Sequence, residues 1–171
     1  KQAGIGSGPS RSIPDGYDRE KGYNELISVF RMMGEIAGEY GMMLAIEPLR
    51  SAETNMITTF AEAAEASSDT GMDNVKALVD LYHMAAEDDD PGSIVKHRDY
   101  LVHAHIAYPA IGTSHERAFP GKDDDCDYAS FFRALKDAGY DDKLSVEAYC
   151  YGNLAESASG ALDALTQLIG N

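Results

Sequence analysis

Four ionisable residues stand in short apolar segments that are spaced along the chain like successive strands. They are separated by 33, 25 and 42 residues, and they are Glu47, Asp80, His105 and Glu147. A bare carboxylate in such a segment is costly to bury, and three gathered together would also repel one another. A divalent cation among them removes both problems, and oxygen ligands with one imidazole favour Mn²⁺, Mg²⁺ or Co²⁺ over a thiolate-type zinc site. The residue types and their spacing therefore predict a divalent-metal centre, with Mn²⁺ as the first choice.

Each of these residues also has an ordinary explanation when it is taken alone. Glu47 can be a strand-end charge in contact with solvent, and Asp80 can cap the turn that follows it. Glu147 is harder to explain in this way, because its sequence neighbours are apolar. His103 and His105 alternate along one segment, and we expect them to face opposite sides of a sheet, so that only His105 is a ligand. A single metal site explains all four positions together, and we prefer it for that reason.

The segments around these residues alternate between helical and strand patterns. Apolar residues between positions 23 and 40 recur every three or four residues, which predicts an amphipathic helix that ends at Gly41. Further helices are expected over residues 60–67, 91–97, 127–139 and 154–169, and strands over 42–49, 75–82, 100–107 and 144–149. No hairpin signal lies between them, so the strands should be parallel. Parallel strands bring their carboxyl ends to one edge, where α/β proteins bind ligands.

The start of the chain has a different composition from the rest. Residues 1–18 are rich in Gly, Ser and Pro, which predicts a loop, either a flexible terminus or a loop that borders the site. Residues 19–171 are expected to form four helix–strand units and a final helix. The sequence thus indicates one α/β domain over residues 1–171. Its first residue is Lys1, and we expect that residues upstream of it are missing.

Overall composition limits the kinds of partner. The chain has 171 residues with 14 Lys and Arg against 29 Asp and Glu, a formal net charge of −15. Such an acidic surface argues against nucleic acid or an anionic membrane as a partner and favours a small polar ligand. No apolar run approaches the roughly 18 residues that a membrane span needs. Two cysteines are too few for a disulfide scaffold and suit a reducing compartment, so we expect a cytoplasmic protein.

Several motifs resemble the sugar isomerase/epimerase superfamily of xylose isomerase-like TIM barrels, and most closely its ketose 3-epimerase branch. They occur in order over nearly the whole chain: Gly6–Gly8 with Arg11 and Pro14, Ile46–Leu49, Asp80–His83, His103–His105, Arg117–Gly121 and Ser145–Glu147. The resemblance implies a (β/α)₈ barrel of which this chain supplies about the C-terminal half, strands five to eight. It also implies Glu47, Asp80, His105 and Glu147 as metal ligands, and Glu53, His83 and Arg117 as substrate contacts.

The implied activity is metal-dependent epimerisation or isomerisation of a ketose through an enediolate. Glu47 and Glu147 would serve as the base and the acid. Alternatives are an aldose–ketose isomerase, an inosose-type dehydratase on the same metal, and a non-catalytic metal- or sugar-binding half-barrel remnant. Residues 106–116 form a longer segment than the family pattern has, which leaves the sugar open. Because a half barrel exposes strand edges, we expect a homo-oligomer, a separate partner half or a missing N-terminal half.

Overall fold

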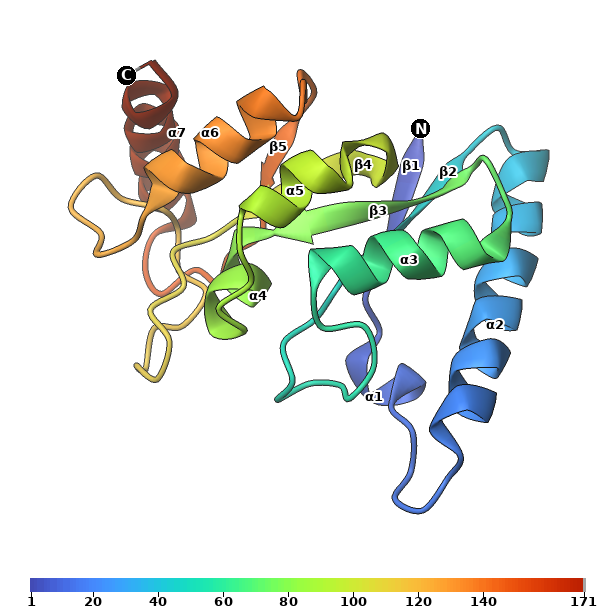
Figure 1. The fold of residues 1–171 in the computed structure, drawn as a ribbon. Helices are drawn as coiled ribbons and strands as arrows, with labels where there is room; N and C mark the ends of the chain where they lie inside the picture. The colour runs from blue at the N-terminus through green and yellow to red at the C-terminus, as the bar shows by residue number, and fades with distance from the viewer. Residues whose placement is uncertain (171) are drawn as a thin grey trace.

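The computed structural model describes residues 1–170, in which a curved parallel sheet runs through the molecule (Figure 1). Its five strands lie side by side in chain order: β1 (Gln2–Ile5), β2 (Met43–Ile46), β3 (Val75–Asp80), β4 (Leu101–Ile106) and β5 (Leu144–Val146). Every pairing is parallel. Sequential parallel strands joined by helices are the arrangement of a TIM barrel, which closes with eight strands. The expected α/β fold, a partial barrel of this type, is confirmed.

Helices follow the strands, and most of them cover the outer face of the sheet, whereas two short ones lie beyond the carboxyl ends of the first and third strands (Figure 1). They are α1 (Gly8–Arg11), α2 (Arg19–Glu39), α3 (Phe60–Thr70), α4 (Leu81–Ala86), α5 (Gly92–Lys96), α6 (Tyr128–Asp137) and α7 (Leu154–Gly170), with a 3₁₀ turn η1 (Arg98–Tyr100) before β4. Local sequence explains several of their ends. Thr59 and Glu62 form a reciprocal capping box at the start of α3, and Gly71 ends that helix in the left-handed conformation.

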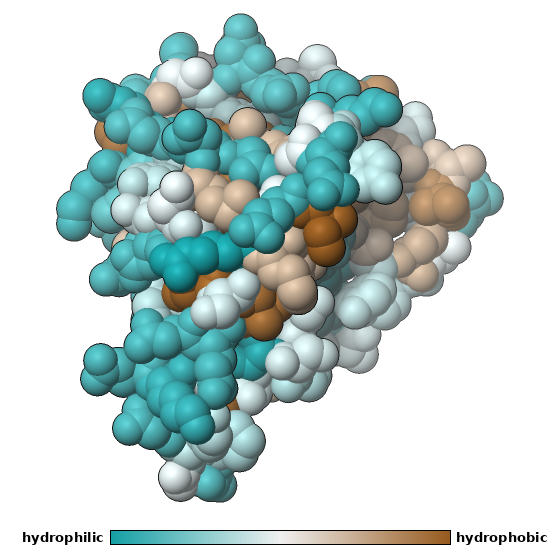
Figure 2. All heavy atoms as spheres, turned by 90° about the vertical axis from the view of Figure 1, so that its right-hand side faces the viewer, coloured by the Kyte–Doolittle hydropathy of each residue, from teal (hydrophilic) through white to brown (hydrophobic). Residues whose placement is uncertain are grey.

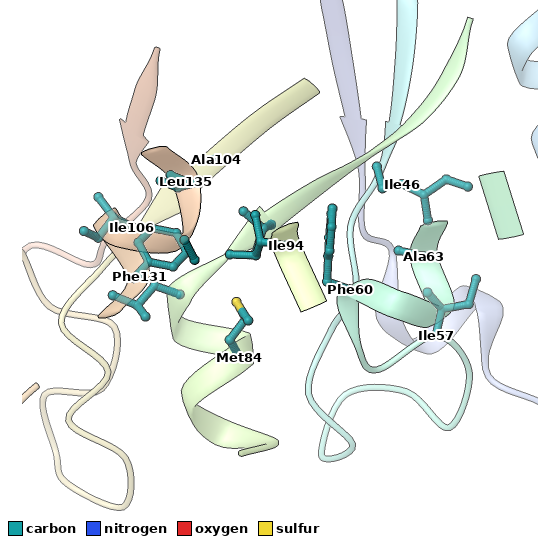
Figure 3. Close-up of a cluster of buried hydrophobic side chains, with 14 of the residues drawn as sticks. Ile46, Ile57, Phe60, Ala63, Met84, Ile94, Ala104, Ile106, Phe131 and Leu135 are labelled. Atoms are coloured by element: carbon teal, nitrogen blue, oxygen red, sulfur yellow. The ribbon is translucent and has the colours of Figure 1, made fainter. Parts of the chain in front are cut away.

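The apolar core lies between the sheet and these outer helices. Figure 3 shows side chains from β2, β4, α3, α5 and α6 meeting there, among them Phe60, Ile94 and Phe131. These three side chains have no exposed surface. Alternate residues of each strand belong to this core, as the two-residue period of a strand requires. The residues between them face the concave side, where the candidate site lies.

Part of the expectation that residues 1–18 form a loop is wrong. Gln2–Ile5 is a strand, paired with β2 from Gln2 opposite Met43 to Ile5 opposite Ile46. Glycine has little preference for strands, so the ladder with β2 rather than local composition holds this segment extended. A Cβ at Gly4 would lie 3.1 Å from Leu78, so the glycine allows β1 to lie close to that side chain. The sheet has five strands where we expected four.

Helix α2 carries apolar side chains on an outer face as well as on the face that packs against the sheet. Val29, Met32, Ile36 and Tyr40 are all exposed, with Tyr40 at 74%. Figure 2, which looks at the side of the molecule where α2 lies, shows hydrophobic atoms interrupting a mainly hydrophilic surface. No helix within residues 1–170 is long and apolar enough to cross a membrane.

Candidate metal centre

Four side chains converge at the carboxyl ends of four neighbouring strands. Glu47 follows β2, Asp80 ends β3, His105 lies one residue before the end of β4, and Glu147 follows β5. One donor atom from each lies within 4.8 Å of the donor atoms of the other three. The convergence predicted from spacing is therefore present, and it follows from parallel pairing, which places Asp80 opposite His105.

Local structure fixes two of these carboxylates. Asp80 is the N-cap of α4, and its Oδ1 accepts a hydrogen bond from Tyr82 N at 2.9 Å, which leaves Oδ2 for the cluster. Asp80 therefore caps the following turn and also belongs to the cluster. Glu47 lies beside the start of the chain, where a Cβ at Gly6 would approach its Oε2 to 2.8 Å. Glycine at position 6 makes room for the Glu47 carboxylate.

Two cationic side chains lie against the carboxylates. His105 Nδ1 is 2.5 Å from Glu147 Oε2 and 3.2 Å from Glu47 Oε1. Arg117 Nη2 is 2.5 Å from Asp80 Oδ2 and 2.8 Å from Glu147 Oε2. The protein's own cations thus neutralise a cluster of carboxylates, which is the electrostatic role that a divalent ion would take.

The pKa values reflect this crowding. Burial raises the pKa of the Asp80 carboxyl, although the Arg117 guanidinium opposes this effect. Burial disfavours the charged form of His105, but hydrogen bonds to Glu147 and Glu47 outweigh it and raise the pKa of the imidazole to about 10. The hydrogen bond from His105 outweighs burial at Glu147 and, with the charge of Arg117, lowers the pKa of that carboxyl to about 2. The cluster is therefore held together by strong coupling between opposite charges.

The donor set fits a hard divalent ion. It offers three carboxylates and one imidazole, and it includes neither Cys126 nor Cys150. Mg²⁺ binds oxygen at about 2.1 Å, so opposite ligands lie about 4.2 Å apart, and small side-chain shifts would bring a cluster of this span onto one ion. Oxygen-rich ligation of this kind suits Mg²⁺ or Mn²⁺ better than a closed structural zinc site.

A cavity of about 310 Å³ adjoins the cluster and is lined in part by the three other residues singled out from the sequence: Glu53, His83 and Arg117. His83 is 1% exposed, and burial lowers the pKa of its imidazole to about 3, so the ring is neutral. Its Nδ1 accepts from Arg50 N at 3.1 Å, which places the ring proton on Nε2. Nε2 faces Arg117 Nη1 at 3.1 Å. With the proton on Nε2 this contact pairs two donors, and an acceptor oxygen beside the pair, within about 2.9 Å of each nitrogen, would satisfy both.

The expectation that His103 faces away from His105 is wrong. Their rings lie edge to face with centroids 5.0 Å apart, because residues two positions apart in a strand share a face. His103 Nε2 is 2.9 Å from Ser145 Oγ, so a serine of β5 engages that ring nitrogen. His105 alone of the two belongs to the four-residue cluster. His105 as a metal ligand stays a prediction, and the argument from alternation that separated it from His103 is wrong.

Sequence reasoning missed a second charged group beside the cavity. It consists of three residues from separate segments: Arg50, Tyr82 and Glu116. Glu116 Oε2 accepts hydrogen bonds from the Arg50 guanidinium and from the Tyr82 hydroxyl, both at 2.9 Å. The guanidinium of Arg50 also donates to Glu53 Oε1 at 2.9 Å. The one signal available in the sequence was the position of Glu116, directly before Arg117 at the end of an unusually long segment.

Comparison with known proteins gives consistent matches. The family model described as xylose isomerase-like TIM barrel matches residues 5–168. An L-ribulose 3-epimerase of Mesorhizobium japonicum is 35% identical over 117 residues, which are 68% of this chain and 37% of that protein. A 3-dehydro-D-guloside 4-epimerase of Escherichia coli is 32% identical over 78 residues, which are 45% of this chain and 30% of that protein.

Solved structures share the fold. The IolI protein with a bound zinc atom superposes with a TM-score of 0.79 at 21% identity, covering 93% of this chain and 60% of that one. A structure of L-ribulose 3-epimerase superposes with a TM-score of 0.78 at 22% identity, covering 99% of this chain and 61% of that one. The chain thus spans about three fifths of these solved chains, and its matches span less than half of the two curated relatives.

Proposed function

The chain belongs to the xylose isomerase-like TIM-barrel family, and we propose that it is a metal-dependent sugar epimerase that moves a proton at the carbon next to a ketone. The observation that carries this proposal is the convergence of three carboxylates and one imidazole beside a polar cavity. The names of the two curated relatives support the reaction class. Position 3 of a ribulose and position 4 of a 3-dehydro sugar are both carbons next to the ketone.

In this proposal the two glutamates exchange the proton. A divalent ion, with Mn²⁺ as the first choice, would supply Lewis-acid stabilisation of the charge that develops on the carbonyl oxygen. Glu47 and Glu147 come from the ends of β2 and β5, with β3 and β4 between them, so they reach the cluster from two sides. One carboxylate takes the C–H proton, and the other, protonated, returns a proton to the opposite face. Asp80 and His105 complete the ligand set without transferring a proton.

The proposed substrate contacts lie in the adjoining cavity. The Nε2–H of His83 and the Nη1 of Arg117 would donate to one sugar oxygen, because the two nitrogens lie 3.1 Å apart and both residues line the cavity. Arginine suits such a position because its charge persists at any working pH. The carboxylate of Glu53 lines the same cavity and would accept a hydrogen bond from a sugar hydroxyl.

Substitution of Glu147 by Gln tests the proton transfer. At saturating Mn²⁺ we expect exchange of the sugar C–H proton with solvent deuterium to fall by about 10²–10⁴-fold, because the amide cannot act as a base. The amide oxygen still offers the metal a donor, and a parallel Mn²⁺ titration separates loss of the base from loss of the ion. Glu87→Gln is the matched control, since the Glu87 carboxylate accepts a hydrogen bond from Ser51 N and lies outside the cluster. Unchanged exchange in Glu147→Gln would remove that residue from the mechanism.

The substrate panel should contain L-ribulose, D-psicose, a 3-keto-glucoside and an inosose. The first two represent ketose 3-epimerisation, and the third represents 4-epimerisation, which the Escherichia coli relative favours as a second candidate. Loss of water from the inosose would identify a dehydratase, because epimerisation leaves the mass unchanged. Mn²⁺ binding with no turnover of any substrate would identify a non-catalytic binding protein.

The edges of the sheet bear on assembly. Within residues 1–170, β1 and β5 each pair with one neighbour only, so each offers an open edge to another strand. Open edges attract further strands, and we propose that strands from a second copy or from another segment complete the barrel. Sedimentation of the purified chain tests the first possibility, since a monomer of 18.5 kDa contradicts closure by a second copy.

A further inference from the structure

The segment between β4 and α6 carries a carboxylate that belongs neither to the metal cluster nor to the proposed substrate contacts. Glu116 Oε2 accepts from Arg50 Nη1 and from the Tyr82 hydroxyl, both at 2.9 Å. Its Oε1 accepts from Gly112 N at 2.8 Å. The three donors lie on the loop after β2, on α4 and on the segment of Glu116 itself. One side chain therefore joins three segments at the same end of the sheet as the cluster.

Arg50 extends this connection to the wall of the cavity. Its Nε donates to Glu53 Oε1 at 2.9 Å, and its backbone N–H donates to His83 Nδ1 at 3.1 Å. Its guanidinium lies over the ring of Tyr82, 5.0 Å from the centroid. Glu116 thus holds the arginine that in turn orients the Glu53 carboxylate and sets the tautomer of His83. Both of these residues line the cavity.

Glu116 also fixes the backbone on one side of Arg117. Arg117 has a φ of 56°, a left-handed conformation that residues with a Cβ rarely adopt. On the N-terminal side, the carboxylate of Glu116 anchors that residue, and its carbonyl oxygen accepts a hydrogen bond from the Tyr151 hydroxyl at 2.7 Å. On the other side Ala118 exchanges two backbone hydrogen bonds with Tyr108, at 2.8 and 3.0 Å. Anchors on both sides keep Arg117 in the conformation from which its guanidinium reaches the cluster.

We propose that Glu116 is a positioning residue that holds Arg50, Glu53 and Arg117 in the arrangement that receives the sugar. The roles of Glu53 and Arg117 toward a sugar rest on the proposed function. The arrangement itself rests only on the hydrogen bonds above. Glu116 lies at the end of the long 106–116 segment, so this segment acts on the site through one side chain.

The test is Glu116→Gln in the full chain. Glutamine keeps the shape, but it loses the charge and has a single acceptor oxygen in place of two, so it cannot accept from all three donors. We expect the amide protons of Arg117 and Ala118 to exchange with solvent about tenfold faster, because their segment loses its anchor. We expect KM for the sugar to rise about tenfold, kcat to change by less than about threefold and Mn²⁺ affinity to change by less than about twofold.

Two comparisons make the test specific. Glu87→Gln removes a carboxylate that anchors the same loop after β2 through Ser51, and it should leave the Arg117 amide and KM unchanged. Arg50→Gln combined with Glu116→Gln should raise KM by less than the product of the two single changes, because part of the Glu116 effect passes through its contact with Arg50. Wild-type exchange and KM in Glu116→Gln would overturn the proposal, and so would additive effects in the double variant. If no sugar is turned over, the proposed function fails, and the exchange rates alone decide whether Glu116 anchors Arg117.

Discussion

The outer face of the sheet and its carboxyl edge both contain almost fully buried side chains, but the two sets are chemically opposite. On the outer face the most buried large side chains are apolar, with Phe30, Phe60 and Phe131 at 1% exposure or less. At the carboxyl edge Asp80 and His83 are each 1% exposed. Apolar burial stabilises a fold, whereas a buried charge costs free energy unless it is paired. The outer face therefore supplies stability, and the carboxyl edge uses some of it to hold reactive groups together.

Removing a buried side chain from the outer face should give the largest change in the free energy of unfolding, and it tests the contrast between the two regions. Phe60→Ala removes a fully buried ring, and we expect the free energy of unfolding to fall by about 3–5 kcal/mol. Urea unfolding followed by circular dichroism measures this change. Leu162→Ala is the control, because Leu162 is 67% exposed and should change stability by less than about 0.5 kcal/mol. Mn²⁺ affinity of folded Phe60→Ala should stay within about threefold of wild type, and a large loss would show that the two regions are not separable.

Metal binding probes the carboxyl edge. Mn²⁺ at about 100 times its dissociation constant should stabilise the chain by about 2.7 kcal/mol, because the ion binds the folded state and not the unfolded chain. The rise in Tm relative to protein treated with a chelator measures this effect. Asp80→Asn should abolish the rise. Asp125→Asn should keep it, because the exposed Asp125 lies outside the cluster. An equal rise in both variants would place the bound ion elsewhere.

A third prediction uses one substitution at two helical glycines. A Cβ at Gly34 in α2 would lie 2.5 Å from Val75 Cγ2, whereas a Cβ at Gly160 in α7 would meet nothing within 4 Å. Gly34→Ala should destabilise the chain by about 1–3 kcal/mol through overpacking on β3. Gly160→Ala should stabilise it by about 0.5–1 kcal/mol through helix propensity. Chemical denaturation measures both, and the same sign for the two would contradict the packing of α2 on the sheet.

Sequence patterns placed most elements correctly but misjudged several of their ends. The helix expected over 23–40 begins at Arg19, because the Asp18 side chain accepts from Lys21 N and caps it. The strand expected over 75–82 stops at Asp80, because the same residue caps α4. The strand expected over 144–149 stops at Val146, and Tyr149 N bonds Arg117 O instead. Caps and loop contacts of this kind compete with periodicity, and periodicity alone does not reveal them.

Part of the candidate site could be found from the sequence because its residues mark strand ends. Glu47, Asp80 and Glu147 interrupt apolar segments, and parallel order places strand ends together. Arg50 and Glu116 give no such signal, since they are 66 residues apart and lie on loops. β1 was missed for a related reason: the Gly-, Ser- and Pro-rich composition around it is typical of a loop, and only its ladder with β2 makes it a strand.

The sequence by itself determined the alternation of helices and strands, the parallel order and the four positions that meet at one edge. Local sequence encodes these features: the spacing of apolar residues indicates the helices and strands, and ionisable residues within apolar segments mark the four positions. Only the tertiary structure decided that Arg117 contacts two carboxylates and that Glu116 joins three segments. The physical reason is that such contacts need distant side chains within hydrogen-bond distance of each other, and the positions of the loops in the folded chain set those distances.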